Sequence, residues 1–195
     1  MVSALHRLLW ALIGLMLTVG GTFIEAFVTP WPWTWDGARP PIASLGVSCQ
    51  VGAVLLVGCA GGAQAGAWSQ MAYLGLGLAG IPVFAHGGGL GYVTEPTFGY
   101  LLGFVPGAWL CGRVARKDKP PLERLAAGAL VGLAAIHACG VAYLLGSYGL
   151  TAADGDRLPL GAALSQYSLE LLPGQLAVAC SAVALAFGLR QLLFY

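Results

Sequence analysis

Few side chains in this 195-residue sequence could carry nucleophilic or proton-transfer chemistry. His137 lies within a long apolar stretch, where an ionisable side chain is a functional hypothesis by default. An intramembrane enzyme would need a hydroxyl within hydrogen-bond reach of this base, and Ser147, Ser165 or Ser168 is the best set available. Neither G-x-S-x-G nor H-E-x-x-H occurs. Catalysis by His137 therefore stands beside a simpler hypothesis, a neutral histidine that bonds to a neighbouring helix.

Other sequence patterns suggest cofactor chemistry but lack its context. Gly75-x-Gly77-x-x-Gly80 fits a dinucleotide-binding pattern, which requires a preceding strand and a following soluble helix. Here it lies in an apolar helix that ends at Ile81-Pro82, so we interpret it as a set of small residues at a helix contact. The three histidines are too scattered to predict a metal site, and no Walker A sequence occurs. We therefore expect no cofactor, no metal and no ATP hydrolysis by this chain.

The segment Leu172-Pro173-Gly174-Gln175 is suited to ligand binding. Proline is favoured at the first helical position, so we expect a helix to begin at Pro173. Its unpaired N–H groups and positive dipole end could hold a carboxylate or a ureido-type carbonyl. Gln175 offers a donor and an acceptor in that first turn, and Glu170 lies just outside it. A plain helix cap near water is the alternative.

Two further segments could close over a ligand. His86 to Pro96 holds Gly87-Gly88-Gly89, and glycine lets a backbone turn tightly or approach a ligand closely. Pro30 to Asp36 places three tryptophans among prolines, which could form a stiff lid. An ordinary turn and an aromatic belt at the membrane interface are the alternatives.

These segments must be positioned by membrane-spanning helices. The chain is 58% hydrophobic and 9% charged, with a mean hydropathy of +0.79, whereas soluble domains carry about a quarter charged residues. Stretches of about 20 apolar residues predict six spans, at roughly 8–28, 42–60, 63–84, 97–115, 124–149 and 173–194. The first apolar run is longer than a usual signal peptide, so we expect a retained helix. The 30 glycines let helices approach closely, and we expect the five cysteines to be unpaired. We thus predict one all-α integral membrane domain over 1–195.

The charged residues predict an orientation. Five of the nine basic residues lie between the fourth and fifth spans: Arg113, Arg116, Lys117, Lys119 and Arg124. The positive-inside rule makes this loop cytoplasmic, and counting spans then places both termini inside, in agreement with Arg7 and Arg190. The 5–6 loop, with Asp154, Asp156 and Arg157, falls outside, together with the tryptophan and glycine segments. A net charge of +1 gives no reason to expect a nucleic-acid partner.

The glycine segment, the helices on either side of it and the Leu172-Pro173-Gly174 segment resemble the BioY family, the biotin-binding membrane subunits (S components) of energy-coupling-factor (ECF) transporters. The matching stretches are Tyr73-Leu-Gly-Leu-Gly-Leu-Ala-Gly-Ile-Pro-Val-Phe84, Gly87-Gly-Gly89, Pro96-Thr-Phe-Gly-Tyr-Leu-Leu-Gly-Phe104 and Leu172-Pro-Gly174. Val47-Ser-Cys-Gln50 is similar to the family's apolar-Thr-Leu-Gln segment. The likeness is strongest over about 70–105, and the order of the stretches suits the family along most of the chain.

The resemblance implies a six-helix subunit of the plasma membrane that captures biotin at the outer face. It would associate with a transmembrane coupling protein and two cytoplasmic ATPases. Gln50, Tyr73, Tyr100 and Gln175 would supply hydrogen bonds, because such pockets place a few polar groups in an apolar wall. The full set of predicted binding residues is Gln50, Tyr73, Phe84, His86, Gly87, Gly88, Gly89, Thr97, Tyr100, Glu170 and Gln175.

The chain departs from the family pattern at three places. The family usually reads Pro-Gly-Asp followed three residues later by Lys, whereas these positions are Gln175 and Val178 here. Glu95 stands where the family usually has Gly. The first helix lacks an Ala-x-x-x-Ala pattern, and Gly14-x-x-x-Thr18 is the small-residue substitute that we predict to contact the coupling protein.

Biotin uptake is therefore the leading hypothesis. An S component for a different vitamin-like solute, an intramembrane enzyme using His137 and a structural partner in a larger complex are the alternatives. A structural partner would show no saturable solute binding and would be stable only within its complex.

Overall fold

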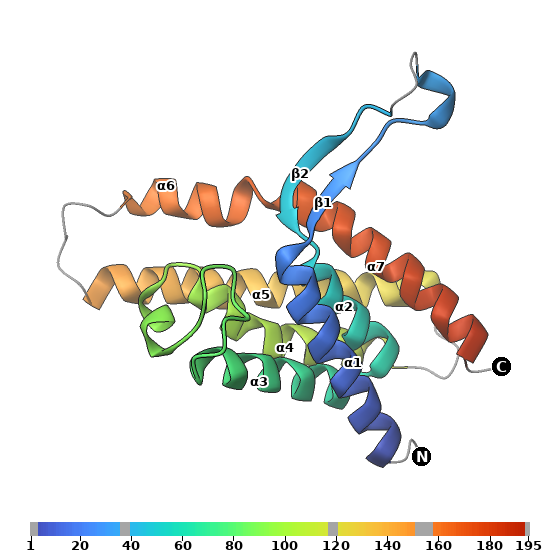
Figure 1. Cartoon of the computed structure of the whole chain (residues 1–195), viewed down its shortest axis with the longest axis horizontal. Helices are drawn as coiled ribbons and strands as arrows, with labels where there is room; N and C mark the ends of the chain where they lie inside the picture. The colour runs from blue at the N-terminus through green and yellow to red at the C-terminus, as the bar shows by residue number, and fades with distance from the viewer. Residues whose placement is uncertain (1–3, 36–39, 117–120, 151–157, 194–195) are drawn as a thin grey trace.

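The computed structural model describes residues 4–35, 40–116, 121–150 and 158–193. Its described part is mostly helical, and six helices account for most of the chain (Figure 1). These are α1 (Ala4–Phe23), α2 (Gln50–Gly61), α3 (Ala63–Leu78), α4 (Phe98–Val114), α5 (Leu122–Leu150) and α7 (Leu172–Leu193). The shorter elements are β1 (Glu25–Val28), η1 (Pro32–Thr34), β2 (Ala43–Ser48), η2 (Leu90–Thr94), α6 (Leu160–Leu164) and the π-helix η3 (Ser165–Leu169).

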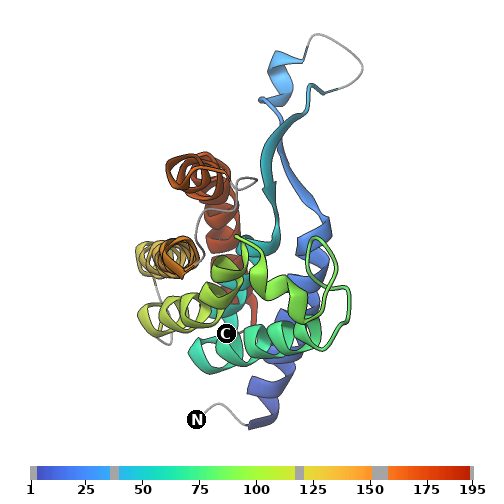
Figure 2. The same ribbon diagram turned by 90° about the vertical axis from the view of Figure 1, so that its left-hand side faces the viewer.

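Each predicted span overlaps one of these helices, and the spans at 42–60 and 63–84 are longer than α2 and α3. Three helical stretches of the described chain are long and apolar enough to cross a membrane: Ala4–Phe23, Leu122–Gly149 and Leu160–Leu192. The last of these includes α6 and η3, which lie before the predicted sixth span at 173–194, in the expected loop. Figures 1 and 2 show α3, α4 and α5 side by side, with α1 crossing α2 and α3 and with α7 beside α2 and α5.

The expectation of an all-α chain is wrong for residues 25–48, because β1 and β2 form an antiparallel hairpin between α1 and α2. The predicted second span from 42 is shortened accordingly. Gly46 has φ +66°, outside the helical region, and its neighbours pair with β1, so the helix begins only at Gln50. Glu25, which falls within the predicted first span at 8–28, lies in β1 and accepts a hydrogen bond from Ser44 across the hairpin.

The base of the hairpin is buried while its tip is exposed. Ala26 and Val47 pack against Val178 of α7. At the tip, the rings of Trp31 and Trp33 stack at 5.0 Å with an interplanar angle of 10°, and both are largely exposed. The tip projects away from the helices, so in this structure the tryptophan segment does not cover the core (Figure 2).

The third helix ends earlier than predicted because of a specific capping motif. Gly80 adopts φ +97°, its N–H donates to Gly77 O, and the Ile81 N–H donates to Leu76 O. This pair of bonds is the Schellman arrangement, which satisfies the last carbonyls of a helix and favours glycine at the left-handed position. Pro82 then excludes continuation of the helix.

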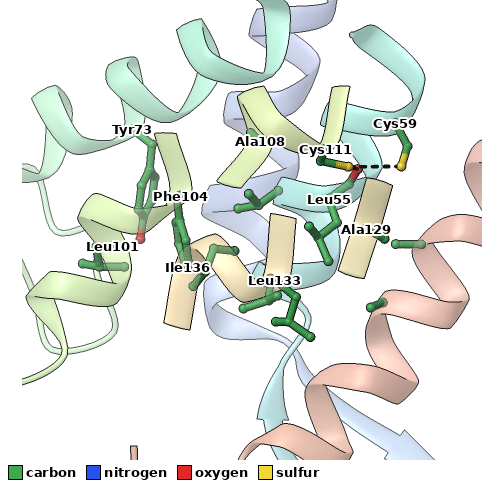
Figure 3. Packing of buried hydrophobic residues seen from close by; sticks show 14 of the residues in the cluster. Leu55, Cys59, Tyr73, Leu101, Phe104, Ala108, Cys111, Ala129, Leu133 and Ile136 are labelled. Carbon is green, nitrogen blue, oxygen red and sulfur yellow. Dashed lines mark hydrogen bonds between the residues drawn. The ribbon is translucent and has the colours of Figure 1, made fainter. Parts of the chain in front are cut away.

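The core draws buried residues from all six helices, and small residues let α4 and α5 approach closely within it. A Cβ at Gly103 would lie 2.8 Å from the carbonyl oxygen of Ile136 and 2.9 Å from its Cα. Figure 3 shows Phe104 and Ala108 of α4 beside Ile136 and Leu133 of α5. In a bilayer such close packing replaces the hydrophobic effect as the force between helices.

All five cysteines are free, as predicted. Two of them meet in the core, where Cys59 Sγ of α2 lies 3.2 Å from Cys111 Sγ of α4 (Figure 3). Several charged residues behind the orientation prediction, namely Lys117, Lys119, Asp154, Asp156 and Arg157, lie outside the described residues.

We predict that Gly103→Ala destabilises the protein by about 1–3 kcal/mol, because the added methyl group meets backbone atoms that cannot rotate away. Thermal unfolding in detergent measures the effect. Gly188→Ala is the matched control, since Gly188 lies in α7 with nothing within 4 Å of a built Cβ. Equal unfolding temperatures for the two variants would contradict the close α4–α5 contact.

Candidate binding site

The hydroxyl of Tyr73 joins four parts of the chain. Gln50 Nε2 donates to it at 2.7 Å, it donates to Val83 O at 3.0 Å, and Thr22 Oγ1 lies 3.2 Å away. Tyr73 itself is fully buried in α3. The ends of α1, α2 and α3 and the following loop therefore meet at one oxygen atom.

The loop after α3 folds back onto the end of that helix. Phe84 and Gly87 exchange backbone hydrogen bonds at 2.9 and 3.1 Å, and Gly89 N donates to Gly77 O at 2.7 Å. A Cβ at Gly88 would lie 2.3 Å from Ile81 O, so only glycine fits there. The predicted glycine segment is thus a tightly packed cap on α3.

Aromatic rings line the inner side of this loop. The Phe84 ring lies edge-on to Tyr73 at 5.3 Å and 4.6 Å from the ring of Tyr92. Phe104 of α4 lies 6.5 Å from Tyr73, as Figure 3 shows. Burial raises the pKa of Tyr92 above its ordinary value, so this loop phenol keeps its proton at neutral pH.

A second polar cluster lies between α4, α5, η3 and α7. His137 Nε2 is 2.7 Å from Gln175 Oε1, and Tyr100 OH is 2.5 Å from Ser168 Oγ. The rings of Tyr100 and His137 meet edge-on at 5.7 Å. Tyr100, Ser168 and Gln175 are buried, so these two hydrogen bonds lie in an apolar surrounding. His137 Nδ1 is buried without a partner among the described residues.

The proposed pairing of His137 with a serine is not formed. Ser147 Oγ donates to Leu144 O, Ser165 Oγ donates to Glu170 Oε1, and Ser168 pairs with Tyr100. His137 instead donates to Gln175. None of the three hydroxyls is thus activated by this imidazole.

The structure brings most of the predicted residues into these two clusters. Gln50, Tyr73, Phe84 and Gly87–Gly89 belong to the first, and Tyr100 and Gln175 belong to the second. His86 and Glu170 are exposed, and Thr97 has a buried hydroxyl without a partner at the head of α4. Sequence reasoning missed Thr22 and considered Ser168 only as a possible partner of His137; the one signal of each was a hydroxyl next to an apolar segment.

The start of α7 differs from the open helix end that we expected. The helix begins at Leu172, one residue before Pro173, but the π-helix η3 precedes it almost directly. Gln175 N donates to Leu171 O, and a Cβ at Gly174 would lie 2.5 Å from Leu45 O of β2. The helix end is therefore covered by the chain itself, and the Gln175 side chain is the polar group available there.

Gly14 and Thr18, predicted to contact a coupling protein, are buried inside the chain. A Cβ at Gly14 would lie 2.7 Å from Val57 Cγ1 and 2.9 Å from Ser69 Cβ. Thr18 Oγ1 accepts a hydrogen bond from Gln70. This small-residue face packs α1 against α2 and α3, and it leaves no exposed surface for a second protein.

The fold is that of a membrane S component. The crystal structure of the S component for biotin from an ECF-type ABC transporter superposes with a TM-score of 0.71 at 20% identity, covering 96% of this chain and 92% of that chain.

The chain belongs to the BioY family, whose family model matches residues 2–194. The probable biotin transporter BioY of Lysinibacillus sphaericus is 40% identical over 105 residues, which are 53% of this chain and 54% of that protein. The biotin transporter BioY of Thermotoga maritima is 37% identical over 102 residues, 52% of this chain and 60% of that protein. The matched region thus spans little more than half the length of these two relatives.

We predict that Tyr73→Phe lowers the stability by about 1–3 kcal/mol, because it leaves the buried Val83 carbonyl and the Gln50 amide without their partner. Thermal unfolding in detergent measures the change. Tyr148→Phe removes a hydroxyl that bonds to Leu158 O in an exposed position, and it should cost clearly less. An unfolding temperature for Tyr73→Phe that equals the wild type would show that this hydroxyl holds nothing together.

Proposed function

We propose that this chain is the substrate-binding subunit of a biotin uptake system. The observation that carries the proposal is the pair of polar clusters around Tyr73 and Gln175, set among aromatic rings in a chain of the BioY family. Biotin combines a fused apolar ring with a ureido group and a carboxylate. A few fixed donors and acceptors in an aromatic wall complement such a ligand.

Binding is recognition without covalent change. Gln50, Tyr73, Tyr100 and Gln175 supply hydrogen bonds, Phe84 supplies apolar surface, and Gly87–Gly89 close over the ligand. His86, Thr97 and Glu170 lie at the rim of this site. No residue of the chain is assigned a catalytic role, and no cofactor is required.

The chain crosses the plasma membrane six times with both termini inside. Support comes from the basic residues, which gather at one end of the helices. Arg7 of α1 donates to Gln64 at the start of α3, and Arg113 and Arg190 lie in the last turns of α4 and α7. Tyr73 bonds to Gln50 at the start of α2, the end of the bundle away from these basic residues. The positive-inside rule therefore puts the site on the outer side of the membrane.

Release to the cytoplasm uses an ECF-type module, made of a transmembrane coupling protein and ATPase subunits. This part of the proposal follows from the family alone. Its contact surface lies elsewhere than Gly14 and Thr18, which the chain buries.

Titration of the purified protein with biotin in a calorimeter tests the ligand. We expect saturable binding at micromolar biotin or below. Absence of heat at that concentration would overturn the assignment to biotin. Saturable binding of another vitamin in its place would retain an S component and change its substrate.

The same titration tests the glycine loop. We expect Gly88→Ala to weaken biotin binding about 10-fold or more, because the added methyl group would lie against Ile81 O and displace the loop from α3. Gly91→Ala is the control, since nothing lies within 4 Å of a Cβ there. Equal affinities in the two variants would exclude this loop from the site.

Fusions test the orientation. A green fluorescent protein fused after Tyr195 should fluoresce, because it folds only in the cytoplasm. Alkaline phosphatase inserted after Gly91 should be active, because it folds only on the outer side of the membrane. The opposite pair of results would invert the proposed orientation.

A further inference from the structure

The amide of Gln175 has a defined orientation. Its oxygen lies 2.7 Å from His137 Nε2, and an amide oxygen only accepts, so the imidazole donates from Nε2. The amide nitrogen has no hydrogen-bond partner in the described part of the chain and is not among the fully buried unpartnered atoms. The two N–H donors of Gln175 are therefore the groups left for a ligand.

His137 is itself held from two sides. The ring of Tyr100 packs edge-on against it at 5.7 Å, and Tyr100 is fixed by its bond to Ser168 at 2.5 Å. Gly140, one turn after His137 on α5, makes room for the Tyr100 ring, since a Cβ there would lie 2.4 Å from that ring. The imidazole is thus positioned by side chains of the protein itself.

Reversal of the Gln175 amide is unfavourable in this setting. It would require the tautomer of His137 that carries its proton on Nδ1, a buried nitrogen with no partner among the described residues. The reversed arrangement would therefore bury an unpaired N–H donor, which keeps the first orientation dominant.

We propose that His137 is a positioning residue that makes Gln175 a hydrogen-bond donor to the ligand. The site at α7 then selects an acceptor oxygen of the ligand. This inference rests on the proposed function. In biotin the acceptor is either the carboxylate or the ureido carbonyl.

Two ligands and one substitution distinguish these oxygens. Gln175→Glu preserves the shape of the side chain but removes both donors and adds a negative charge. We expect about 10- to 100-fold weaker binding of biotin by calorimetry, the range for losing a hydrogen bond to a charged group. The primary amide of biotin lacks the carboxylate. A much smaller loss for that amide identifies the carboxylate as the partner, and an equal loss identifies the ureido carbonyl.

The positioning role of His137 is tested by coupling. His137→Phe keeps a ring but no donor, and we expect biotin to bind about 3- to 10-fold more weakly. In a Gln175→Met background, which has neither donor nor charge, the same change should have a smaller effect, because no donor remains to be oriented. His137→Gln restores a donor at similar reach and should recover most of the affinity. Unfolding temperatures of all variants identify any that fail to fold.

The outcomes separate this inference from the proposed function. If wild-type protein does not bind biotin, the proposed function fails. If the wild type binds and Gln175→Glu binds equally well, the donor role alone is overturned. If His137→Phe weakens binding by the same factor in both backgrounds, His137 is a structural residue and the positioning role is overturned.

Discussion

The structure depends on the need of every polar group among apolar helices for a partner within the chain. Hydrocarbon offers no hydrogen bonds, so an unpaired donor or acceptor is costly there. The Tyr73 hydroxyl meets this constraint by taking Gln50, Val83 and Thr22 together. That oxygen holds together the end of α1, the start of α2 and the second half of α3. It also holds the loop after α3, because the Val83 carbonyl of that loop accepts its proton. The packing between α4 and α5 contributes close van der Waals contact, which small residues such as Gly103 allow.

The same constraint explains why the second cluster is neutral. Gln175 and Val178 stand where the resembling family usually carries an acid and a base, and the pair is replaced together. A lone buried carboxylate or ammonium would require its counter-ion, whereas Gln175 Oε1 and His137 Nε2 pair without needing one. The exchange still joins α5 to α7 through the bond between His137 and Gln175, and it changes which hydrogen-bonding atoms remain for a ligand.

Hydropathy predicted all six helices, since a run of apolar residues is a strong signal whatever surrounds it. It failed at residues 25–48, because an apolar composition suits a strand as well as a helix. The strand is distinguished there only by the positive φ of Gly46 and by the pairing with β1, and hydropathy detects neither. It also failed at 160–169, which continues the helical stretch toward α7. Most polar residues of the site were recognisable as single exceptions in apolar runs. Their pairing was not, because His137 and Gln175 lie 38 residues apart and meet only through the packing of α5 on α7.

The π-helix before α7 carries a consequence for comparing this chain with its relatives. Glu170 N donates to Ser165 O, five residues back, so this turn holds one residue more than an α-helical turn. Removing one residue there would rotate everything on one side of it by about 100° relative to the other. Ser168 would then leave Tyr100 although no residue of the cluster had changed. An alignment without a gap across this turn, made with a relative that is one residue shorter there, would thus assign equivalence to side chains that face different ways.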